Sequence, residues 1–273
     1  MLREPGPHRS VPGALSTRTI VLTFDNLGEA SELERSTWTG RRPIGQHPSV
    51  TNALPRLLQE LTDLDLRGTF FVEAINCELN PRAVLSIAER GHELGIHGWR
   101  HESWGDLTPG RERELLHRSR QALRKLDLDA PAFRPPGGAI NPDTPALLRE
   151  IGCRWASPLG TIPHVDGDGF GWVPFEWEMV DAYHLMDRFA SLRGRRGDSE
   201  NSLPTSRAAE RLRAGLTSHV PARTLILHAF LMADDGWWNE VRKLLHRLAE
   251  LRETGQFRIV TGGELTERLA GQG

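Results

Sequence analysis

The sequence predicts a single α/β domain in which parallel strands alternate with helices to form a barrel. Short apolar, β-branched runs alternate with segments of helical periodicity along the whole chain of 273 residues. Several of the apolar runs end in a polar residue, as barrel strands do where they reach the active-site face. We divide the chain into a flexible Pro- and Gly-rich segment (1–16) and one barrel domain (17–273), with long insertions at about 29–48 and 184–207.

The first third of the chain begins with a strand at 18–24, which is β-branched and apolar as a strand buried on both faces should be. The polar, irregular stretch that follows is long for a connection between a strand and a helix, which is typical of functional loops. A helix is expected at about 50–66 because its leucines recur at helical spacing. A strand at 68–72 and a helix at 81–90 complete this part.

The middle of the chain is marked by capping and turn signals. Thr108 is the expected N-cap of a helix that extends to Leu126, with Pro109 at its first position. Gly152 is expected to close a second helix. The elements predicted around them are a short strand at Phe133, a helix at 142–151, and strands at 153–156 and 173–179.

The last third opens with the segment from His184 to Arg207, which is charged and contains glycines and a proline. We expect this insertion to bury little apolar surface and to be a mobile loop beside the site. Regular alternation then resumes, with a helix at 208–217, a strand at 223–228, a helix at 238–254, a strand at 257–260 and a helix at 264–270.

Composition excludes several classes of function. The formal net charge is −2, so no nucleic acid partner is implied. No apolar run has the length of a signal peptide core or of a membrane span, and we therefore expect a soluble, cytoplasmic protein without membrane insertion. Cys77 and Cys153 are too few for a disulfide framework and lack zinc-finger spacing.

Polar side chains lie at four of the predicted strand ends. Asp25 follows the first strand, Arg134 follows the strand at Phe133, and His228 ends the strand at 223–228. His97 and His101 follow a short apolar run, and in a helical turn two residues at this spacing share one face and can bind one metal ion. A polar residue at one strand end would not indicate a site. In a barrel, however, the carboxyl ends of all the parallel strands lie on one face, so these four should converge.

In these motifs the chain resembles the polysaccharide deacetylase (NodB-homology, carbohydrate esterase) family over nearly its whole length. The resemblance rests on Thr23-Phe24-Asp25-Asn26, on His97 and His101, on Arg134-Pro135-Pro136-Gly137-Gly138, and on Leu225-Ile226-Leu227-His228. The counterpart of the fourth motif is the segment that ends at Asp181, whose alternative role is that of a solvated aspartate at a helix start. The family implies a distorted parallel (β/α)7-type barrel.

The resemblance also implies a mechanism for hydrolysis of an amide. A divalent ion, usually zinc, would bind between His97 and His101 and lower the pKa of a bound water. Asp25 would take the proton from that water, and His228 would protonate the departing amine. Arg134 would orient Asp25, and Asp181 would orient His228.

One position departs from the family pattern. Asn26 stands where the family usually has a metal-binding aspartate, so the metal site would consist of His97, His101 and a neutral amide oxygen. The alternative is that Asp25 itself binds the metal. The loss of a negative ligand should weaken metal affinity and leave the bound water more acidic.

The implied substrate is an N-acetylated amino sugar, either a soluble saccharide or a glycosylated metabolite. The bias toward arginine fits a GC-rich antibiotic producer, which leaves an antibiotic intermediate open as a substrate. Aromatic rings near the predicted mouth could stack on sugar rings, or they could be ordinary core residues. The residues expected to contact substrate are Trp99, Trp104, Pro136, Gly137, Trp237 and Trp238.

Two other functions stay open on the sequence. Some relatives in this family resemble allantoinases, which open cyclic amides, and the motifs do not exclude that chemistry. Asn26 also leaves open a barrel that binds a sugar without catalysis. The retained Asp25, Arg134 and His228 argue against the second alternative, because a sugar-binding protein has no use for an acid–base pair.

Overall fold

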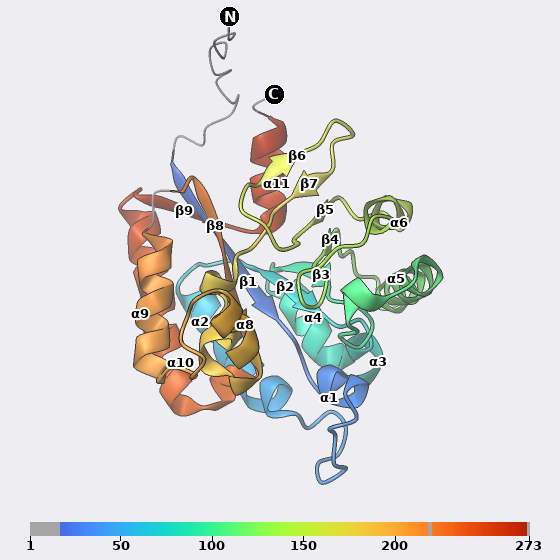
Figure 1. The fold of residues 1–273 in the computed structure, drawn as a ribbon, viewed down its shortest axis with the longest axis horizontal. Helices are drawn as coiled ribbons and strands as arrows, with labels where there is room; N and C mark the ends of the chain where they lie inside the picture. The colour runs from blue at the N-terminus through green and yellow to red at the C-terminus, as the bar shows by residue number, and fades with distance from the viewer. Residues whose placement is uncertain (1–16, 218–219, 272–273) are drawn as a thin grey trace, which may run out of the picture.

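The computed structural model describes residues 17–217 and 220–271, so the N-terminal segment predicted at 1–16 lies outside the described residues. Within the described part, nine strands form one curled sheet with helices around its outside (Figure 1). The strand order is β6-β7-β5-β4-β3-β2-β1-β8, and β9 also pairs with β1. All pairings are parallel except that between β6 and β7.

Strand β1 (Arg18–Asp25) is the centre of the sheet. It pairs from Thr19 to Asp25 with β8 (Ala222–His228), and on its other side with β9 (Phe257–Val260) and then with β2 (Thr69–Val72). All but the first residue of β1 are buried, as its apolar, β-branched sequence predicts. The register places Asp25 directly beside His228, so the first and last motifs meet at the carboxyl ends of two neighbouring strands.

The other side of the sheet consists of short strands. These are β3 (Glu93–Ile96), β4 (Ala132–Phe133), β5 (Trp155–Ala156), β6 (His164–Val165) and β7 (Gly171–Trp172). An isolated bridge between Val180 and Ile226 connects the chain after β7 to β8, so the sheet curls back toward its first edge. The prediction of a distorted parallel α/β barrel is confirmed for the main sheet, and the antiparallel pairing of β6 with β7 was not predicted.

Helices connect the strands and cover the sheet with their apolar faces. On α2, for example, Leu54, Leu57, Leu58 and Leu61 are buried, which accounts for their spacing. Thr108 caps α5 by accepting a hydrogen bond from the backbone N–H of Arg111, as predicted. The helices are α1 (Ala30–Glu34), α2 (Leu54–Asp63), α3 (Asn76–Leu79), α4 (Pro81–Glu89), α5 (Pro109–Arg124), α6 (Thr144–Glu150), α7 (Asp181–Leu185), α8 (Ala190–Arg195), α9 (Thr205–Leu216), α10 (Asp235–Glu253) and α11 (Gly262–Ala270).

The predicted strand at 173–179 is only partly formed, because Phe175 makes a single parallel bridge to Leu159 and no continuous strand is present. The ladder stops at Trp172, and a 3₁₀ turn occupies Trp177–Met179. Pro174 lies between them, and a proline cannot donate a backbone hydrogen bond to a neighbouring strand. The apolar residues Val173, Phe175 and Met179 of this segment are buried, which accounts for its strand-like sequence.

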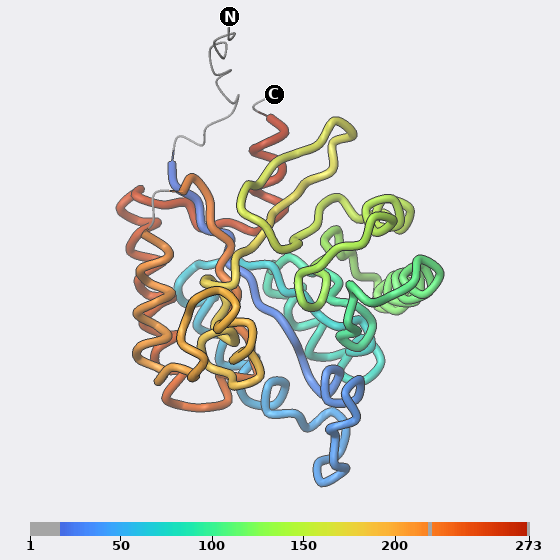
Figure 2. Tube along the Cα trace, in the orientation of Figure 1, coloured from blue at the N-terminus to red at the C-terminus, as the bar shows by residue number. Residues whose placement is uncertain are grey.

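The segment at 184–207 is also not the loop that we expected. It contains the end of α7, a 3₁₀ turn, α8 and the first residues of α9. The chain folds back on itself here, and α7 contacts α9 (Figure 2). The buried guanidinium of Arg193 fixes its shape by donating to the backbone carbonyls of Tyr183, Met186, Ser199 and Glu200. A charged residue thus acts as the core of this insertion, which a count of apolar residues could not reveal.

Candidate active site

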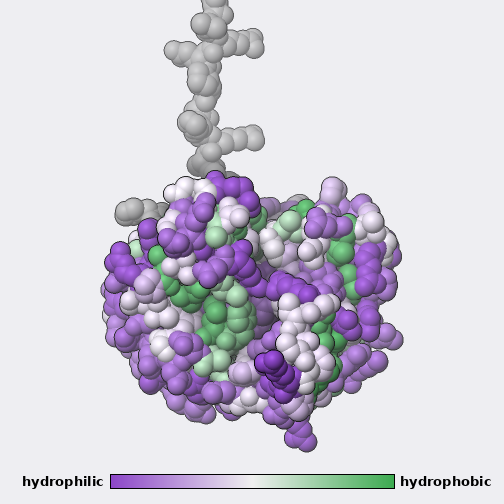
Figure 3. All heavy atoms as spheres, turned by 60° about the horizontal axis from the view of Figure 1, so that its bottom comes forward, coloured by the Kyte–Doolittle hydropathy of each residue, from purple (hydrophilic) through white to green (hydrophobic). Residues whose placement is uncertain are grey.

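The polar strand ends meet in one pocket of about 200 Å³ at the carboxyl ends of the strands. Asp25, His97, His101, Arg134 and His228 all line it. The lower side of the molecule in Figure 1 is turned forward in Figure 3, which shows a hollow bordered by apolar surface. The four strand ends therefore converge as the sequence predicts.

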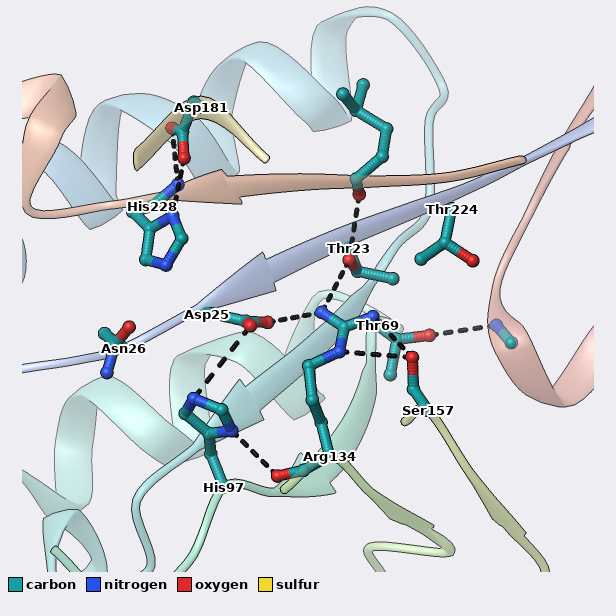
Figure 4. Close-up of polar contacts among 12 residues, drawn as sticks. Thr23, Asp25, Asn26, Thr69, His97, Arg134, Ser157, Asp181, Thr224 and His228 are labelled. Atoms are coloured by element: carbon teal, nitrogen blue, oxygen red, sulfur yellow. Dashed lines mark hydrogen bonds and ion pairs between the residues drawn. The ribbon is translucent and has the colours of Figure 1, made fainter. Parts of the chain in front are cut away.

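Asp25 is held by Arg134 at the base of the pocket. Nη1 of Arg134 donates to Oδ1 of Asp25 at 2.6 Å and to Oγ1 of Thr23 at 2.9 Å (Figure 4). Its Nε and Nη2 donate to the hydroxyl of Ser157, and its guanidinium lies 4.1 Å from the ring centroid of Phe71. Burial lowers the pKa of Arg134, and the charge of Asp25 opposes that shift. Arg134 therefore orients Asp25 as expected, and Oδ2 of Asp25 faces the pocket.

His228 is held in place by the carboxylate of Asp181. Nδ1 of His228 lies 2.5 Å from Oδ1 of Asp181, and the backbone N–H of His228 donates to Oδ2 of Asp181 at 2.8 Å. Asp181 is fully buried at the start of α7, so it is not the solvated aspartate of the alternative interpretation. Because a carboxylate only accepts, Nδ1 of His228 carries a proton and Nε2 is left for the pocket (Figure 4).

His97 and His101 meet through a loop, and the helical turn that we expected for them is wrong. Their ring centroids are 4.9 Å apart, although no helix covers residues 97–101. The chain reverses at Gly98 and at His101, which have φ values of 73° and 78°. The carboxylate of Glu102 holds this turn by accepting from the backbone N–H groups of Trp99 and Arg100.

His97 has the protonation state that a metal ligand requires. Its Nδ1 donates to the backbone carbonyl of Arg134 at 2.8 Å, so the lone pair of the neutral ring is on Nε2. Nε2 lies 4.0 Å from Oδ2 of Asp25, too far for a hydrogen bond. Burial lowers the pKa of His97 to about 3, which keeps the ring neutral.

Asn26 presents a buried oxygen that has no partner. Its backbone is left-handed, with φ of 62°, and its Nδ2 donates to Oε1 of Glu73. The other oxygen of Glu73 accepts from the N–H of Leu27 at 3.0 Å, which fixes the amide with Oδ1 on the opposite side. Oδ1 of Asn26 has no hydrogen-bond partner in the structure. A buried amide oxygen without a partner is costly unless something else binds it.

His101 is in contact with a cation. Nη2 of Arg35 lies 3.2 Å from its Nδ1, and since a guanidinium only donates, that nitrogen carries the lone pair. Among the described residues there is no group of three His, Cys, Asp or Glu side chains arranged to hold a metal. The two imidazoles and the amide oxygen of Asn26 nevertheless fit a divalent transition metal, provided that the exposed Arg35 side chain moves aside.

The tryptophans predicted to contact substrate are core residues instead. Trp104 packs on Phe133 and donates to the hydroxyl of Thr144, and the guanidinium of Arg118 stacks on Trp99. None of the predicted four lines the pocket, and each is buried beneath a helix or loop: Trp99, Trp104, Trp237 and Trp238. Their position in the sequence, near the predicted mouth, does not indicate whether these tryptophan side chains are buried or exposed.

The aromatic wall of the pocket comes from another part of the chain. Phe175, Trp177 and Phe189 line it, from the segment after β7 and from the insertion. Of the two predicted turn residues, Gly137 lines the pocket, whereas Pro136 is buried and its neighbour Pro135 takes the lining position.

Sequence reasoning missed three charged residues at the site. Glu73 directly follows β2, so the rule that found Asp25 could have found it, and burial raises its pKa to about 7. Arg35 and Arg188 lie in the two insertions, where no periodic pattern marks them, and both line the pocket. The Arg188 side chain reaches solvent, yet the protein packed around it and the charge of Arg35 lower its pKa to about 10.

Comparison with known proteins decides the family. The model of the polysaccharide deacetylase family matches residues 13–156, which is more than half of the chain. The chain belongs to the polysaccharide deacetylase family. The matched region of this family member contains Asp25, His97, His101 and Arg134, while Asp181 and His228 lie beyond it.

Individual relatives differ in how much of the chain they cover. Chitin deacetylase 1 of Saccharomyces cerevisiae is 34% identical over 129 residues, which are 47% of this chain and 38% of that protein. The chain thus spans about a third of the length of the first curated relatives it matches.

Solved structures show the same fold along the whole chain. A putative polysaccharide deacetylase from Mycobacterium smegmatis superimposes with a TM-score of 0.80 at 24% identity, covering 98% of this chain and 95% of that one. The PuuE allantoinase superimposes with a TM-score of 0.71 at 15% identity, covering 98% of this chain and 94% of that one.

No described helix combines the length and the apolar character that a membrane span needs.

Proposed function

We propose that this chain is a metal-dependent amide hydrolase that removes the acetyl group from an N-acetylated amino sugar. The observation that carries the proposal is the pair of Asp25 and His228 in one pocket, each fixed by its own charged partner. Family membership supports the same class of reaction.

The residues of the chain divide the proton transfers between them. Asp25 accepts a proton from the attacking water through Oδ2, because Oδ1 is engaged by Arg134. His228 takes up a proton from solvent on Nε2 and passes it to the departing amine, which leaves the ring neutral with its proton on Nδ1. Asp181 compensates the charge that the ring carries while both nitrogens are protonated. His97, His101 and Asn26 would hold a divalent ion, zinc in the first instance, which supplies polarisation of the water and of the amide carbonyl.

The size of the pocket limits what the site can enclose. A volume of about 200 Å³ is below the range of about 300–1,000 Å³ that encloses a drug-sized ligand. The pocket therefore suits the N-acetyl group and the sugar that carries it, and the rest of a larger glycoside would lie outside. We propose a small saccharide or a glycosylated metabolite as substrate.

Product analysis tests the proposed reaction. The protein is incubated with N-acetylglucosamine, chitooligosaccharides or allantoin, with and without added zinc, and acetate and free amine are measured. Equal amounts of acetate and amine from a sugar, in the zinc sample alone, are expected. Ring opening of allantoin without sugar cleavage would replace the proposal with the cyclic amide reaction, and sugar binding without any product would leave a binding protein.

A further inference from the structure

The two insertions place two arginines at the mouth of the pocket. Arg35 follows α1 in the first insertion, and Arg188 lies in the 3₁₀ turn Asp187–Phe189 of the second. Both line the pocket together with Asp25 and the three histidines. Segments far apart in the chain thus bring two guanidinium groups to the place where a substrate must enter.

Neither arginine has a carboxylate partner among the described residues. Arg35 donates to the hydroxyl of Ser31 at 2.8 Å and contacts His101, while Arg188 lies over the ring of Phe189 at 5.0 Å. A neighbouring arginine that lies outside the pocket has such a partner. Arg42, on the same insertion as Arg35, pairs with Glu32 at 2.7 Å and does not line the pocket.

The charge of the pocket is therefore unbalanced. Asp25 is the one acidic side chain among the described lining residues, and Arg134 already pairs with it. Two further guanidinium groups that face the same space repel each other, which destabilises the empty pocket unless an anion binds between them. A divalent ion held by two imidazoles and the amide of Asn26 would add positive charge that no ligand neutralises.

We propose that Arg35 and Arg188 bind an oxyanion of the substrate, so that the sugar carries a carboxylate or a phosphate in addition to its N-acetyl group. A guanidinium can donate two parallel hydrogen bonds to two oxygens of either anion, and it is weakly hydrated, so it loses little solvation on binding. The aromatic wall of Phe175, Trp177 and Phe189 would then face the apolar side of the sugar ring. This specificity deepens the proposed function and rests on it.

Binding measurements separate the charge preference from catalysis. Calorimetry on the zinc-loaded, slow Asp25→Asn variant compares N-acetylglucosamine with N-acetylglucosamine 6-phosphate and with N-acetylmuramic acid, which distinguishes a phosphate from a carboxylate. We expect at least one anionic sugar to bind about tenfold or more tightly than the neutral one, as a charge-assisted hydrogen bond would provide. The preference should shrink at high ionic strength. Equal or weaker binding of both anionic sugars would overturn the inference.

Variants of Arg188, with Arg42→Gln as the control, test whether this arginine provides the preference. Arg188→Gln should lower the anionic-to-neutral ratio of affinities, and of kcat/KM, by about tenfold, whereas Arg188→Lys should retain part of it. Arg42→Gln, which removes an arginine of the same mouth region outside the pocket, should leave both ratios unchanged. If Arg188→Gln slows neutral and anionic substrates equally, the arginine acts on the reacting carbonyl and the inference is wrong.

The two proposals fail in different ways. Tight binding of an anionic sugar that is lost in Arg188→Gln, without release of acetate from any sugar, would remove the proposed reaction and keep the anion site. Release of acetate with no preference for an anionic sugar would keep the reaction and remove the anion site.

Discussion

Replacing Asn26 with aspartate tests the environment of the proposed third metal ligand. In the metal-free protein, the new carboxylate would lie against Glu73, because Nδ2 of Asn26 now donates to Oε1 of Glu73. Two carboxylates about 4 Å apart repel each other by about 4 kcal/mol at an effective dielectric constant of about 20. One of them must therefore take up a proton or the fold must be destabilised.

Glu73 is the group that should take up the proton. Burial has already raised its pKa to about 7, so holding a proton there costs less than about 1 kcal/mol near neutral pH. A carboxyl whose pKa is raised by folding binds more protons in the folded state, so stability falls as pH rises from its unfolded pKa to its folded pKa. In the wild type this fall ends near pH 7. In Asn26→Asp it should continue above pH 7, at up to about 1.4 kcal/mol per pH unit.

Urea unfolding with a chelator present, at pH 6, 7, 8 and 9, measures the effect. Asn26→Asp should be within about 1 kcal/mol of the wild type at pH 6 and should fall behind steadily above pH 7. The double variant Asn26→Asp/Glu73→Gln should lose the additional slope, because the amide cannot ionise. Parallel stability curves for wild type and Asn26→Asp across this range would refute the reasoning about Glu73.

Three further predictions concern other parts of the molecule. His228→Ala should lower kcat by about 10²–10⁴ and Asp181→Asn by less, with zinc retained in both, and near-normal turnover of His228→Ala would remove it as the acid. Burial lowers the pKa of His92 to about 4, so folding excludes a proton there. Acidification from pH 6.5 to 4 should lower the free energy of unfolding by about 1–3 kcal/mol in wild type and by less in His92→Phe. The same dependence on pH in both proteins, measured by urea unfolding, would contradict this. Arg193→Leu strands the four carbonyls it now satisfies, and should destabilise the insertion by at least about 2 kcal/mol and speed its hydrogen exchange; unaltered exchange would show that the arginine is not what holds it.

The parts that the sequence could predict are those where one local pattern determines the structure. The β1 run ending at Asp25 and the β8 run ending at His228 are buried strands, and parallel pairing alone brings their ends together. Helix periods and caps, such as Thr108, were likewise readable because each depends on residues close in the chain. The four strand ends of the site followed from these elements.

The parts that could not be predicted depend on contacts between distant segments. Trp104 looks like a mouth residue in the sequence, but it is buried, with Phe133 of β4 packed against its ring. The ordered structure of the second insertion depends on the buried guanidinium of Arg193. A prediction from composition treats an arginine as an exposed residue. Arg35 and Arg188 carry no pattern at all, since their role depends on which pocket the two insertions reach.

Acetate release by metal-stripped and metal-reloaded protein tests the central proposal most directly. The wild type is treated with a chelator, dialysed, and assayed on an N-acetylated sugar before and after one equivalent of zinc, with Asp25→Asn treated in the same way. We expect no turnover without metal, recovery with zinc, and at least about a 10²-fold lower rate for zinc-loaded Asp25→Asn. Full activity in the stripped protein, or an unimpaired Asp25→Asn variant, would contradict a metal-dependent hydrolase that uses Asp25 as its base.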